Sequence, residues 1–490
     1  LISQDKTIED SLRYLISSFK NGKEFGSILT IKPLDFDKIK EVISNFEKNN
    51  NLTKFKYPNE INLLKNIINQ SISLSKKYDV IVTNPPYMGN SGMNPNLKDY
   101  LKKNYPDSKS DLFAAFIEKC HDFCNEKGFV AMITQQSFMF LSTFEKLRVE
   151  LINYHTIINM AHLGSHAFDE IGGEVVQATS FINRNNFIKN YNSTFHRLTE
   201  FNSESKKEKE FHNDGNKYVI KQVNFNKIPG SPISYWLDNL TFNTFEKGKS
   251  MDKISDHTGS QNITADNKKF IRYFWEISNE EIGVSKKWVL YAKGGEFRKY
   301  YGNLNWVVDW SNEARNFYKN NKTSNLLDEK YWYEEGITYT KVSSKAASFR
   351  YLPTGCIFDK GGPSICYLYD NLDYVLGFLN SNIASYYLNI LNPTINFQVR
   401  DICALPLIFE DKYNQKIKFY VRENIEICKN DWNDYETSLE FKSHPFLIFW
   451  ENTIKQSFNE WKKHKEHDFN KLKNNEIELN KIFRNLWDWY

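Results

Sequence analysis

Residues 78–87 of this chain read YDVIVTNPPY. The first six are an apolar run with three β-branched residues in succession, which is typical of a buried strand. Pro85 and Pro86 cannot both continue a ladder, because proline lacks the backbone N–H. The stretch therefore predicts a buried strand that leaves its sheet at Asn84 in a rigid turn.

The segments after this turn alternate between helix and strand patterns. Apolar residues recur at helical spacing from Phe113 to Cys124, behind the candidate caps Ser110 and Asp111. Another helix is expected at about 143–154, and the apolar runs predict strands at 129–134, 157–163 and 175–182. Strands that alternate with helices imply a largely parallel α/β sheet.

The other segments have different patterns. Residues 1–77 read as mostly helical, and the polar residues 183–216 as a linker or exposed insertion. Short β-like stretches and glycine turns follow, and then a charged, tryptophan-rich helical region. We expect an α/β core at 1–200, a mixed α+β domain at 217–410 and a helical tail at 411–490.

The composition narrows the classes of protein. Hydrophobic residues make up 40% and charged residues 25% of the 490, which excludes a disordered chain. No apolar run is long enough to span a membrane. Six cysteines without a CxxC pair favour a reducing, cytoplasmic compartment. The net charge is only +4, so any binding of nucleic acid must come from local basic patches.

The turn at Asn84 can serve a specific chemistry. Ligands of α/β sheets bind at the carboxyl ends of the strands. An exocyclic amine that attacks a methyl group needs acceptors for its two N–H bonds. The side-chain oxygen of Asn84 and the carbonyl of Pro85 can supply them, without a competing proline N–H. Tyr87 could stack on the planar ring. The structural alternative is a strand that merely stops at proline.

These residues resemble a known family. Residues 84–87 are similar to the NPPY motif of amino-methyltransferases that use S-adenosylmethionine, in particular the adenine-N6 DNA methyltransferases. The resemblance continues in DLFAAFIEKC at 111–120 and GFVAMITQQS at 128–137. Residues 167–170 and 172–177 are similar to the region that supplies a second aromatic ring for the target base, which here would be Phe168.

The second half narrows the resemblance to the large methyltransferases of BREX phage-defence systems. The similar segments are 264–267, 270–272, 287–289, 293–299, 336–339, 343–344 and 378–381. The resemblance implies a partial Rossmann-like methyltransferase core, a target-recognition domain and a helical tail. The family's glycine-rich cofactor loop is not found in residues 1–83, so the residues that bind S-adenosylmethionine are expected upstream of Leu1.

Basic residues are interleaved with aromatic residues around Gly294 and Gly295, and Glu296 is the only acid nearby in sequence. Such a cluster could grip phosphates, or it could be the solvated face of a hairpin. The resemblance favours DNA. The candidate DNA contacts are Arg272, Lys287, Lys293, Arg298, Lys299 and Lys360. His464 and His467 lie among lysines and read as a solvated face, so no metal site is expected.

The resemblance implies methyl transfer from S-adenosylmethionine to adenine N6 in double-stranded DNA, with the base flipped out between Tyr87 and Phe168. It also implies self-marking in phage defence, with other defence-system proteins as partners and no membrane. Two alternatives stay open. One is a DNA-recognition module without catalysis. The other is methylation of glutamine amides in proteins, against which the long aromatic and basic second half argues.

Overall fold

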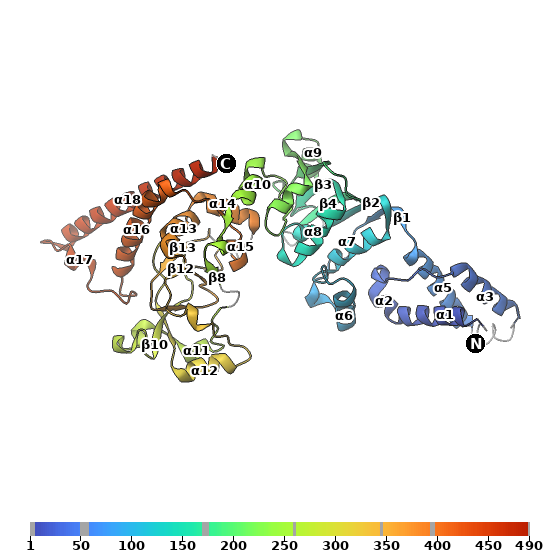
Figure 1. Cartoon of the computed structure of the whole chain (residues 1–490), viewed down its shortest axis with the longest axis horizontal. Helices are drawn as coiled ribbons and strands as arrows, with labels where there is room; N and C mark the ends of the chain where they lie inside the picture. Colours follow the sequence, from blue (N-terminus) through green and yellow to red (C-terminus); the bar gives the residue numbers. More distant parts are fainter. Residues whose placement is uncertain are drawn as a thin grey trace. The chain divides into compact units, whose positions relative to one another are not determined.

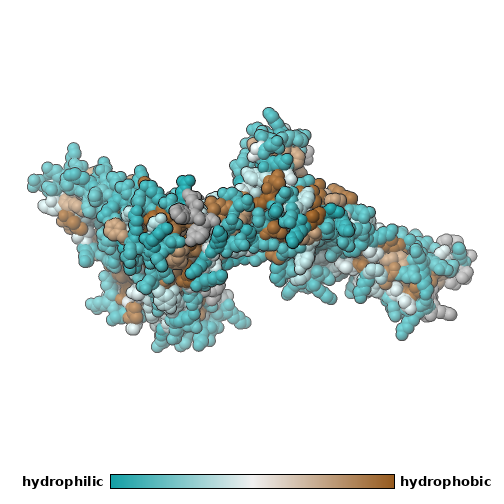
Figure 2. All heavy atoms as spheres, turned by 45° about the horizontal axis from the view of Figure 1, so that its top comes forward, coloured by the Kyte–Doolittle hydropathy of each residue, from teal (hydrophilic) through white to brown (hydrophobic). Residues whose placement is uncertain are grey.

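The computed structural model describes residues 5–49, 58–168, 176–257, 261–343, 346–392 and 397–488. The chain divides into two compact units, Leu1–Leu237 and Asp238–Tyr490. Figure 1 shows their elements. On the face shown in Figure 2, hydrophilic residues predominate and apolar residues gather in patches. Among the described residues, no helix has both the length and the apolar character needed to cross a bilayer.

Helices form the start of the first unit, as the sequence predicted. They are α1 (Lys6–Ser18), α2 (Gly22–Phe25), α3 (Phe36–Asn49) and α5 (Pro58–Ser75). The carboxylate of Asp5 caps α1 by accepting from the backbone N–H of Thr7 at 2.9 Å. Leu15 and Ile39 are fully buried between these helices. This apolar cluster holds the helices together ahead of the sheet.

A six-stranded sheet in the order β1-β2-β4-β3-β5-β6 follows. Its strands are β1 (Tyr78–Thr83), β2 (Cys124–Gln135), β3 (Thr156–Gly164), β4 (Ala178–Arg184), β5 (Asn192–Arg197) and β6 (Lys217–Lys221). The pairs β1–β2 and β3–β5 are parallel and the other three are antiparallel. Thus β1, β2, β3 and β5 share one direction. The α/β class is confirmed, but the sheet is mixed because β4 runs antiparallel between β2 and β3.

Strand β5 corrects one prediction from the sequence. Residues 183–216 are not a linker, because β5 pairs with β3 and β6, and α9 (Glu204–Phe211) follows. Ser193 and Phe195 are fully buried. Only alternate residues of a strand face the core. In the sequence NSTFHR, this leaves one large apolar residue, so the composition concealed the strand.

Helices α7 (Leu112–Phe123) and α8 (Glu145–Tyr154) lie beside the sheet, whereas α6 (Pro95–Asn104) contacts α2 (Figure 1). The predicted cap of α7 is confirmed, since the Asp111 carboxylate accepts from the backbone N–H of Phe113. Phe113 and Ile117 are fully buried on this helix. Helix α7 contacts β1 and β2, while α8 contacts β3. The two helices therefore fix the strands whose ends carry the candidate site.

The second unit contains two four-stranded sheets, in the orders β14-β10-β11-β9 and β13-β12-β15-β8, and a two-stranded one. The strands are β7 (Lys249–Ser250), β8 (Asp256–His257), β9 (Ile271–Tyr273), β10 (Trp288–Ala292), β11 (Trp306–Asp309), β12 (Gly336–Tyr339), β13 (Phe349–Leu352), β14 (Cys356–Phe358), β15 (Ser364–Cys366) and β16 (Pro406–Leu407). The predicted mixture of short strands and turns is confirmed.

Helices complete this unit. They are α10 (Asn239–Lys247), α11 (Asn267–Phe270), α12 (Asn312–Asn320), α13 (Leu372–Leu379), α14 (Asn382–Leu391), α15 (Val399–Cys403), α16 (Asp411–Asn433), α17 (Pro445–Ile448) and α18 (Ile454–Asp488). The long helices α16 and α18 contact each other and α13. Leu479 and Phe483 of α18 are buried. The helical tail therefore packs on the rest of its unit.

Candidate active site

Several candidate residues meet at one edge of the six-stranded sheet. Because β1, β2, β3 and β5 share one direction, their carboxyl ends lie at the same edge, where ligands of α/β sheets bind. Asn84 follows β1, Gln136 follows β2, and Phe168 comes shortly after β3. The antiparallel strand β4 begins at this edge, directly after Gln177. The edge thus carries three side-chain amides, those of Asn84, Gln136 and Gln177.

The proline turn exposes its polar residue. Asn84 and Pro86 are exposed, whereas Pro85 is buried. Thr83, the last residue of β1, pairs with Met132, and the ladder stops there as the two prolines require. The Asn84 amide is therefore open to a ligand, and its carbonyl oxygen can accept a hydrogen bond.

Tyr87 has a fixed orientation beside this turn. Its half-buried ring packs edge-on against Phe113, with centroids 6.2 Å apart and planes at 80°. Its hydroxyl donates to the carbonyl of Ile133 in β2 at 3.4 Å. Burial raises the pKa of the phenol, so Tyr87 stays neutral. The ring is thereby anchored to both α7 and β2.

Asp111 has a role that the sequence did not predict. Besides capping α7, its Oδ1 accepts from the backbone N–H of Met88 at 3.0 Å. The N–H of Leu112 donates to the carbonyl of Met88, also at 3.0 Å. Burial raises the pKa of this carboxyl. Asp111 therefore ties the end of the proline turn to the start of α7.

A second group missed at the sequence level lies behind the same edge. His162 Nδ1 is 2.9 Å from the Tyr235 hydroxyl, and His162 Nε2 is 2.7 Å from Gln136 Oε1. Gln136 Nε2 donates to Gln177 Oε1 at 2.6 Å. Tyr235 and His162 are buried, whereas Gln177 is exposed. Polar contacts thus run from the core to the sheet edge.

Phe168 is half-buried and lies four residues beyond the end of β3. Residues 169–175, which belong to the same predicted region, lie outside the described residues. The role of Phe168 as a second stacking ring stays a prediction.

Most of the predicted DNA contacts have acidic partners within the second unit. The pairs are Lys287–Asp309 at 4.0 Å, Lys293–Asp359 at 3.1 Å, Arg298–Asp431 at 3.2 Å and Lys299–Glu476 at 3.1 Å. The side chains of Lys293 and Lys299 are only 20% and 24% exposed. Glu296 is therefore not the only acid near the cluster, because the fold brings acids from distant segments.

The two glycine turns of the second unit pack against each other. The Asp359 carboxylate accepts from the backbone N–H groups of Gly361 at 2.6 Å and Gly362 at 3.1 Å, and it pairs with Lys293. Gly294 has φ +80°, and a Cβ there would lie 2.6 Å from the Gly361 oxygen. Only glycine allows this approach. The Lys293–Asp359 pair thus connects two turns that are far apart in sequence.

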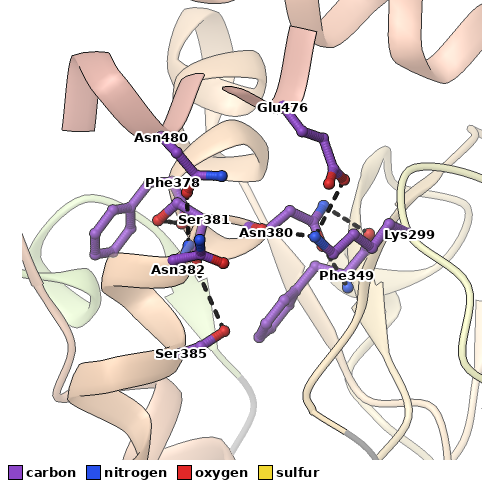
Figure 3. Close-up of polar contacts among 9 residues, drawn as sticks. All are labelled: Lys299, Phe349, Phe378, Asn380, Ser381, Asn382, Ser385, Glu476 and Asn480. Carbon is purple, nitrogen blue, oxygen red and sulfur yellow. Dashed lines mark hydrogen bonds and ion pairs between the residues drawn. The ribbon is translucent and has the colours of Figure 1, made fainter. Parts of the chain in front are cut away.

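Lys299 lies at a junction between sheet and helices (Figure 3). Its ammonium donates to the carbonyl of Asn380 at 3.1 Å and to Glu476 of α18. The Asn380 amide accepts from the N–H of Phe349 at 3.1 Å and donates to its carbonyl at 2.9 Å. Lys299 therefore helps to hold α18 on β13 and α13.

Replacing Lys299 or Glu476 should lower the stability of the second unit. Each single change leaves a partly buried charge unpaired, so Lys299→Met and Glu476→Gln should each destabilise, and the double variant should lose less than their sum. A coupling of about 0.5–3 kcal/mol is expected for residues in direct contact. Urea unfolding of the four proteins measures it. Additive losses would contradict the contact.

The remaining predicted DNA contacts differ in exposure. Arg272 donates to the carbonyls of Lys268 at 2.6 Å and Ile271 at 2.7 Å. Lys360 is exposed, and the Lys287 side chain is 56% exposed. Lys287 and Lys360 are therefore the residues of the set most open to a ligand.

The described residues offer little to hold a metal or a methyl donor. None of them forms a group of three or more His, Cys, Asp or Glu suited to a metal ion. Residues 5–49 and 58–77 form helices and turns, without a glycine-rich strand-to-helix turn. The binding of a target amine at the sheet edge stays a prediction, and no described residue is assigned to the methyl donor.

The chain is similar to known methyltransferases. Residues 11–169 match the Eco57I restriction-modification methylase family. Over 97% of its length, the chain is 36% identical to the adenine-specific methyltransferase PglX of Lacticaseibacillus casei (strain Zhang), and it covers 42% of that protein. It is a relative of PglX. The predicted resemblance is confirmed.

A second relative agrees. The adenine-specific methyltransferase BrxX of Escherichia coli O9:H4 (strain HS) is 37% identical over 86% of this chain, which covers 35% of BrxX. The chain thus spans less than half the length of PglX and of BrxX. Among solved structures, the Type IIL restriction-modification enzyme MmeI in complex with DNA has a TM-score of 0.48 and 12% identity, covering 86% of this chain and 56% of MmeI.

Proposed function

We propose that this relative of PglX is an adenine-specific DNA methyltransferase that transfers a methyl group from S-adenosylmethionine to adenine N6 in duplex DNA. The observation that carries the proposal is the turn at Asn84, which places an exposed amide beside the anchored ring of Tyr87 at the carboxyl edge of the sheet. The similarity to enzymes named adenine-specific methyltransferases supports adenine as the target.

The chemistry follows from the acceptors in the turn. Asn84 Oδ1 and the Pro85 carbonyl would each accept a hydrogen bond from one of the two N–H groups of the N6 amine. This favours the tetrahedral nitrogen, whose lone pair forms the new N–C bond while the S–C bond of the methyl donor breaks. The nitrogen becomes cationic and then releases its proton to water. No strong base is needed, which agrees with a turn whose only polar side chains are an amide and a neutral phenol.

The amine of a stacked base cannot reach such a turn. We propose that the adenine flips out of the duplex and stacks on Tyr87, with Phe168 as the second ring. Tyr87 follows β1 and Phe168 follows β3, two strands that run in the same direction. The contacts of Tyr87 with Phe113 and Ile133 fix the plane of its ring before a base arrives. A ring that is already ordered loses less entropy on stacking.

The direct test is the product. The native gene product is incubated with duplex DNA and S-adenosylmethionine, and the DNA is digested to nucleosides. We expect N6-methyl-2′-deoxyadenosine among the nucleosides, and sequencing of the undigested DNA should place the modified base at one sequence motif. Methylation at cytosine N4, or methylation of protein glutamine instead of DNA, would overturn the proposal. Specific DNA binding without any methylated product would favour the alternative of a non-catalytic recognition module.

We propose that Lys287 and Lys360 contribute phosphate contacts, because they are the most exposed of the predicted set. The double variant Lys287→Ala/Lys360→Ala should weaken binding to specific and random duplexes alike. The slope of log affinity against log salt should fall by about 1.8, since each contact contributes about 0.9. Fluorescence anisotropy at several salt concentrations measures both.

The matched control removes the same charge elsewhere. Lys462 and Lys463 are exposed on α18, and each pairs only with a neighbouring glutamate of that helix in the described structure. Lys462→Ala/Lys463→Ala should leave the slope unchanged. Equal slopes for the two double variants would show that Lys287 and Lys360 make no specific contact.

We infer a biological role from the resemblance to BREX methyltransferases. The methylation would mark the cell's own DNA in phage defence, with other proteins of the system as partners. The six free cysteines fit a reducing cytoplasm, where such DNA lies. Deleting the gene should remove N6-methyladenine from one genomic motif and leave other motifs unchanged. Unchanged methylation across the genome would contradict this role.

A further inference from the structure

Four side chains of the first unit form one continuous chain of hydrogen bonds, in the order Tyr235, His162, Gln136 and Gln177. The mechanism above uses none of them. Tyr235 is 1% exposed and His162 5% exposed, so the chain begins in the core. It ends at Gln177, which is exposed at the sheet edge that also carries Asn84.

The buried end determines the direction of the chain. Among the described residues, the Tyr235 hydroxyl has one hydrogen-bond partner, Nδ1 of His162. Burial raises the pKa of Tyr235 and lowers that of His162 to about 3, so the phenol keeps its proton and the imidazole is neutral. The hydroxyl therefore donates to Nδ1, and the single N–H of His162 is on Nε2.

The same donor-to-acceptor direction continues along the hydrogen bonds from His162 to the exposed Gln177. His162 Nε2–H donates to Gln136 Oε1, so the Gln136 NH₂ group donates to Gln177 Oε1. The oxygen of Gln177 is engaged, and its NH₂ group, on an exposed residue, has no partner among the described residues. Reversing the chain would leave the buried Tyr235 hydrogen unpaired, at a cost of about 1–3 kcal/mol. An exposed glutamine can usually present either its oxygen or its NH₂ group to a ligand. Here the hydrogen-bond chain leaves the NH₂ group available.

The distance to Asn84 suits a single base. Gln177 immediately precedes β4 and Asn84 follows β1, with β2 as the only strand between them. Two strand spacings are about 10 Å. Thr83 pairs with Met132 and Ala178 pairs with Gln135, so Gln177 also lies about three residues, roughly 10 Å, further along the strands than Asn84. The two Cα positions are therefore roughly 14 Å apart. Asparagine and glutamine side chains with one planar ring can span that separation. A base held at Asn84 by its exocyclic amine therefore extends its ring toward Gln177.

We propose that Gln177 donates an N–H to a ring nitrogen of the target adenine, and that Tyr235, His162 and Gln136 are positioning residues that hold its amide in this orientation. The inference rests on the proposed function. Adenine N1, N3 and N7 are all acceptors, so an outward NH₂ group matches them. An oriented, neutral N–H donor matches a neutral ring nitrogen. A phosphate is instead bound by cationic side chains, whose charge attracts it in any rotamer.

The test pairs protein variants with altered bases. Wild type and Gln177→Leu methylate duplexes that carry adenine, 1-deazaadenine, 3-deazaadenine or 7-deazaadenine at the target. Each deaza base lacks one ring acceptor. For one analogue, wild type should lose about tenfold to a hundredfold in kcat/KM. With adenine, Gln177→Leu should have a kcat/KM that is lower than that of wild type by the same factor. With that analogue, the kcat/KM of Gln177→Leu should fall no further.

Tyr235→Phe tests the positioning role, because it removes one hydroxyl and keeps the ring. It should reduce the discrimination between adenine and that analogue, while Tyr218→Phe, which alters a ring packed against Tyr235, should not. Partial unfolding lowers kcat/KM for all substrates equally and leaves this ratio unchanged. Normal discrimination in Tyr235→Phe would remove the positioning role.

The outcomes also separate this inference from the proposed function. A wild-type enzyme that makes N6-methyladenine, with the same discrimination in Gln177→Leu, would overturn the contact with Gln177 alone. A wild-type enzyme that methylates no adenine would overturn the proposed function and this inference together.

Discussion

Asn84→Ala should abolish methyl transfer and leave the affinity for DNA nearly unchanged. In the proposed mechanism, the Asn84 oxygen acts on the reacting nitrogen, whose N–H bonds become stronger donors as it turns cationic. The contact therefore belongs mainly to the transition state. Loss of one such polar contact costs about 3–4 kcal/mol, a factor of hundreds or more in rate. Tritiated methyl incorporation measures the rate, and a gel-shift titration measures the affinity.

Asn90→Ala is the matched control, because Asn90 is an exposed asparagine six residues further along the same loop region. It should retain wild-type incorporation. If Asn84→Ala also incorporates methyl groups at nearly the wild-type rate, Asn84 has no part in the reaction. If it loses DNA affinity in proportion to its rate, Asn84 contributes to binding and not to the chemical step.

The elements around Asn84 could be predicted because their signals are local. An apolar β-branched run, two prolines and an aspartate before a helical apolar stripe specify β1, the turn and α7 within residues 78–123. The prediction that this strand is buried was wrong, because β1 is at the edge of the sheet and its Val80 and Val82 are exposed. Each signal acts on neighbouring residues through backbone geometry and capping. The direction of β4 is set by its pairing with β2 and β3, which an apolar pattern does not encode.

The charge environment of the basic cluster could not be predicted in the same way. The sequence shows only Glu296 beside Lys293, Arg298 and Lys299. Asp431 is 133 residues from Arg298, and Glu476 is 177 residues from Lys299. Such pairs form only when α16 and α18 pack on the sheets. The approach of Gly294 to Gly361 also joins segments that are far apart in sequence, although both turns were recognised separately.

The hydrogen-bond chain at the sheet edge was missed for a related reason. Gln136 and Gln177 stand within segments that the resemblance covers, but a glutamine at a strand end has no periodicity that marks it. His162 is 26 residues from Gln136 and 73 from Tyr235. Only the order β2-β4-β3 brings these side chains together. Topology, rather than local pattern, creates this part of the candidate site.

The first unit should lose stability steeply in mild acid. The rings of His121 and His155 pack with centroids 4.0 Å apart, and burial lowers the pKa of His121 to about 4 and of His155 to about 3. His121 Nδ1 donates to the Ile117 carbonyl at 2.9 Å, while Asn183 donates to its Nε2 at 3.4 Å. A proton on Nε2 would face the Asn183 NH₂ group, so the folded state resists it.

The sign of the effect follows from these directions. As the pH falls below about 6.5, histidines of the unfolded chain take up protons that the folded state refuses until about pH 4. Stability is complete above that window and falls within it by about 1.4 kcal/mol per pH unit for each such histidine. Glu118 acts in the opposite direction, because burial raises its pKa to about 7. Burial also raises the pKa of Asp111 and Glu150, so three carboxyls of this unit oppose the histidines whose pKa burial lowers, which are His121, His155, His162 and His196.

His155→Phe isolates the effect, since it keeps an aromatic ring against His121 and removes one titrating group. Its stability should depend on pH less steeply than that of wild type, by about 1.4 kcal/mol per pH unit between pH 6 and 4.5. Hydrogen exchange of β3 and β4, corrected for the intrinsic pH dependence, reports the stability of this unit alone. His212→Phe is the control, because that ring is exposed in the folded chain. Equal pH slopes for His155→Phe and wild type would show that the buried pair takes up protons as readily as the unfolded chain does.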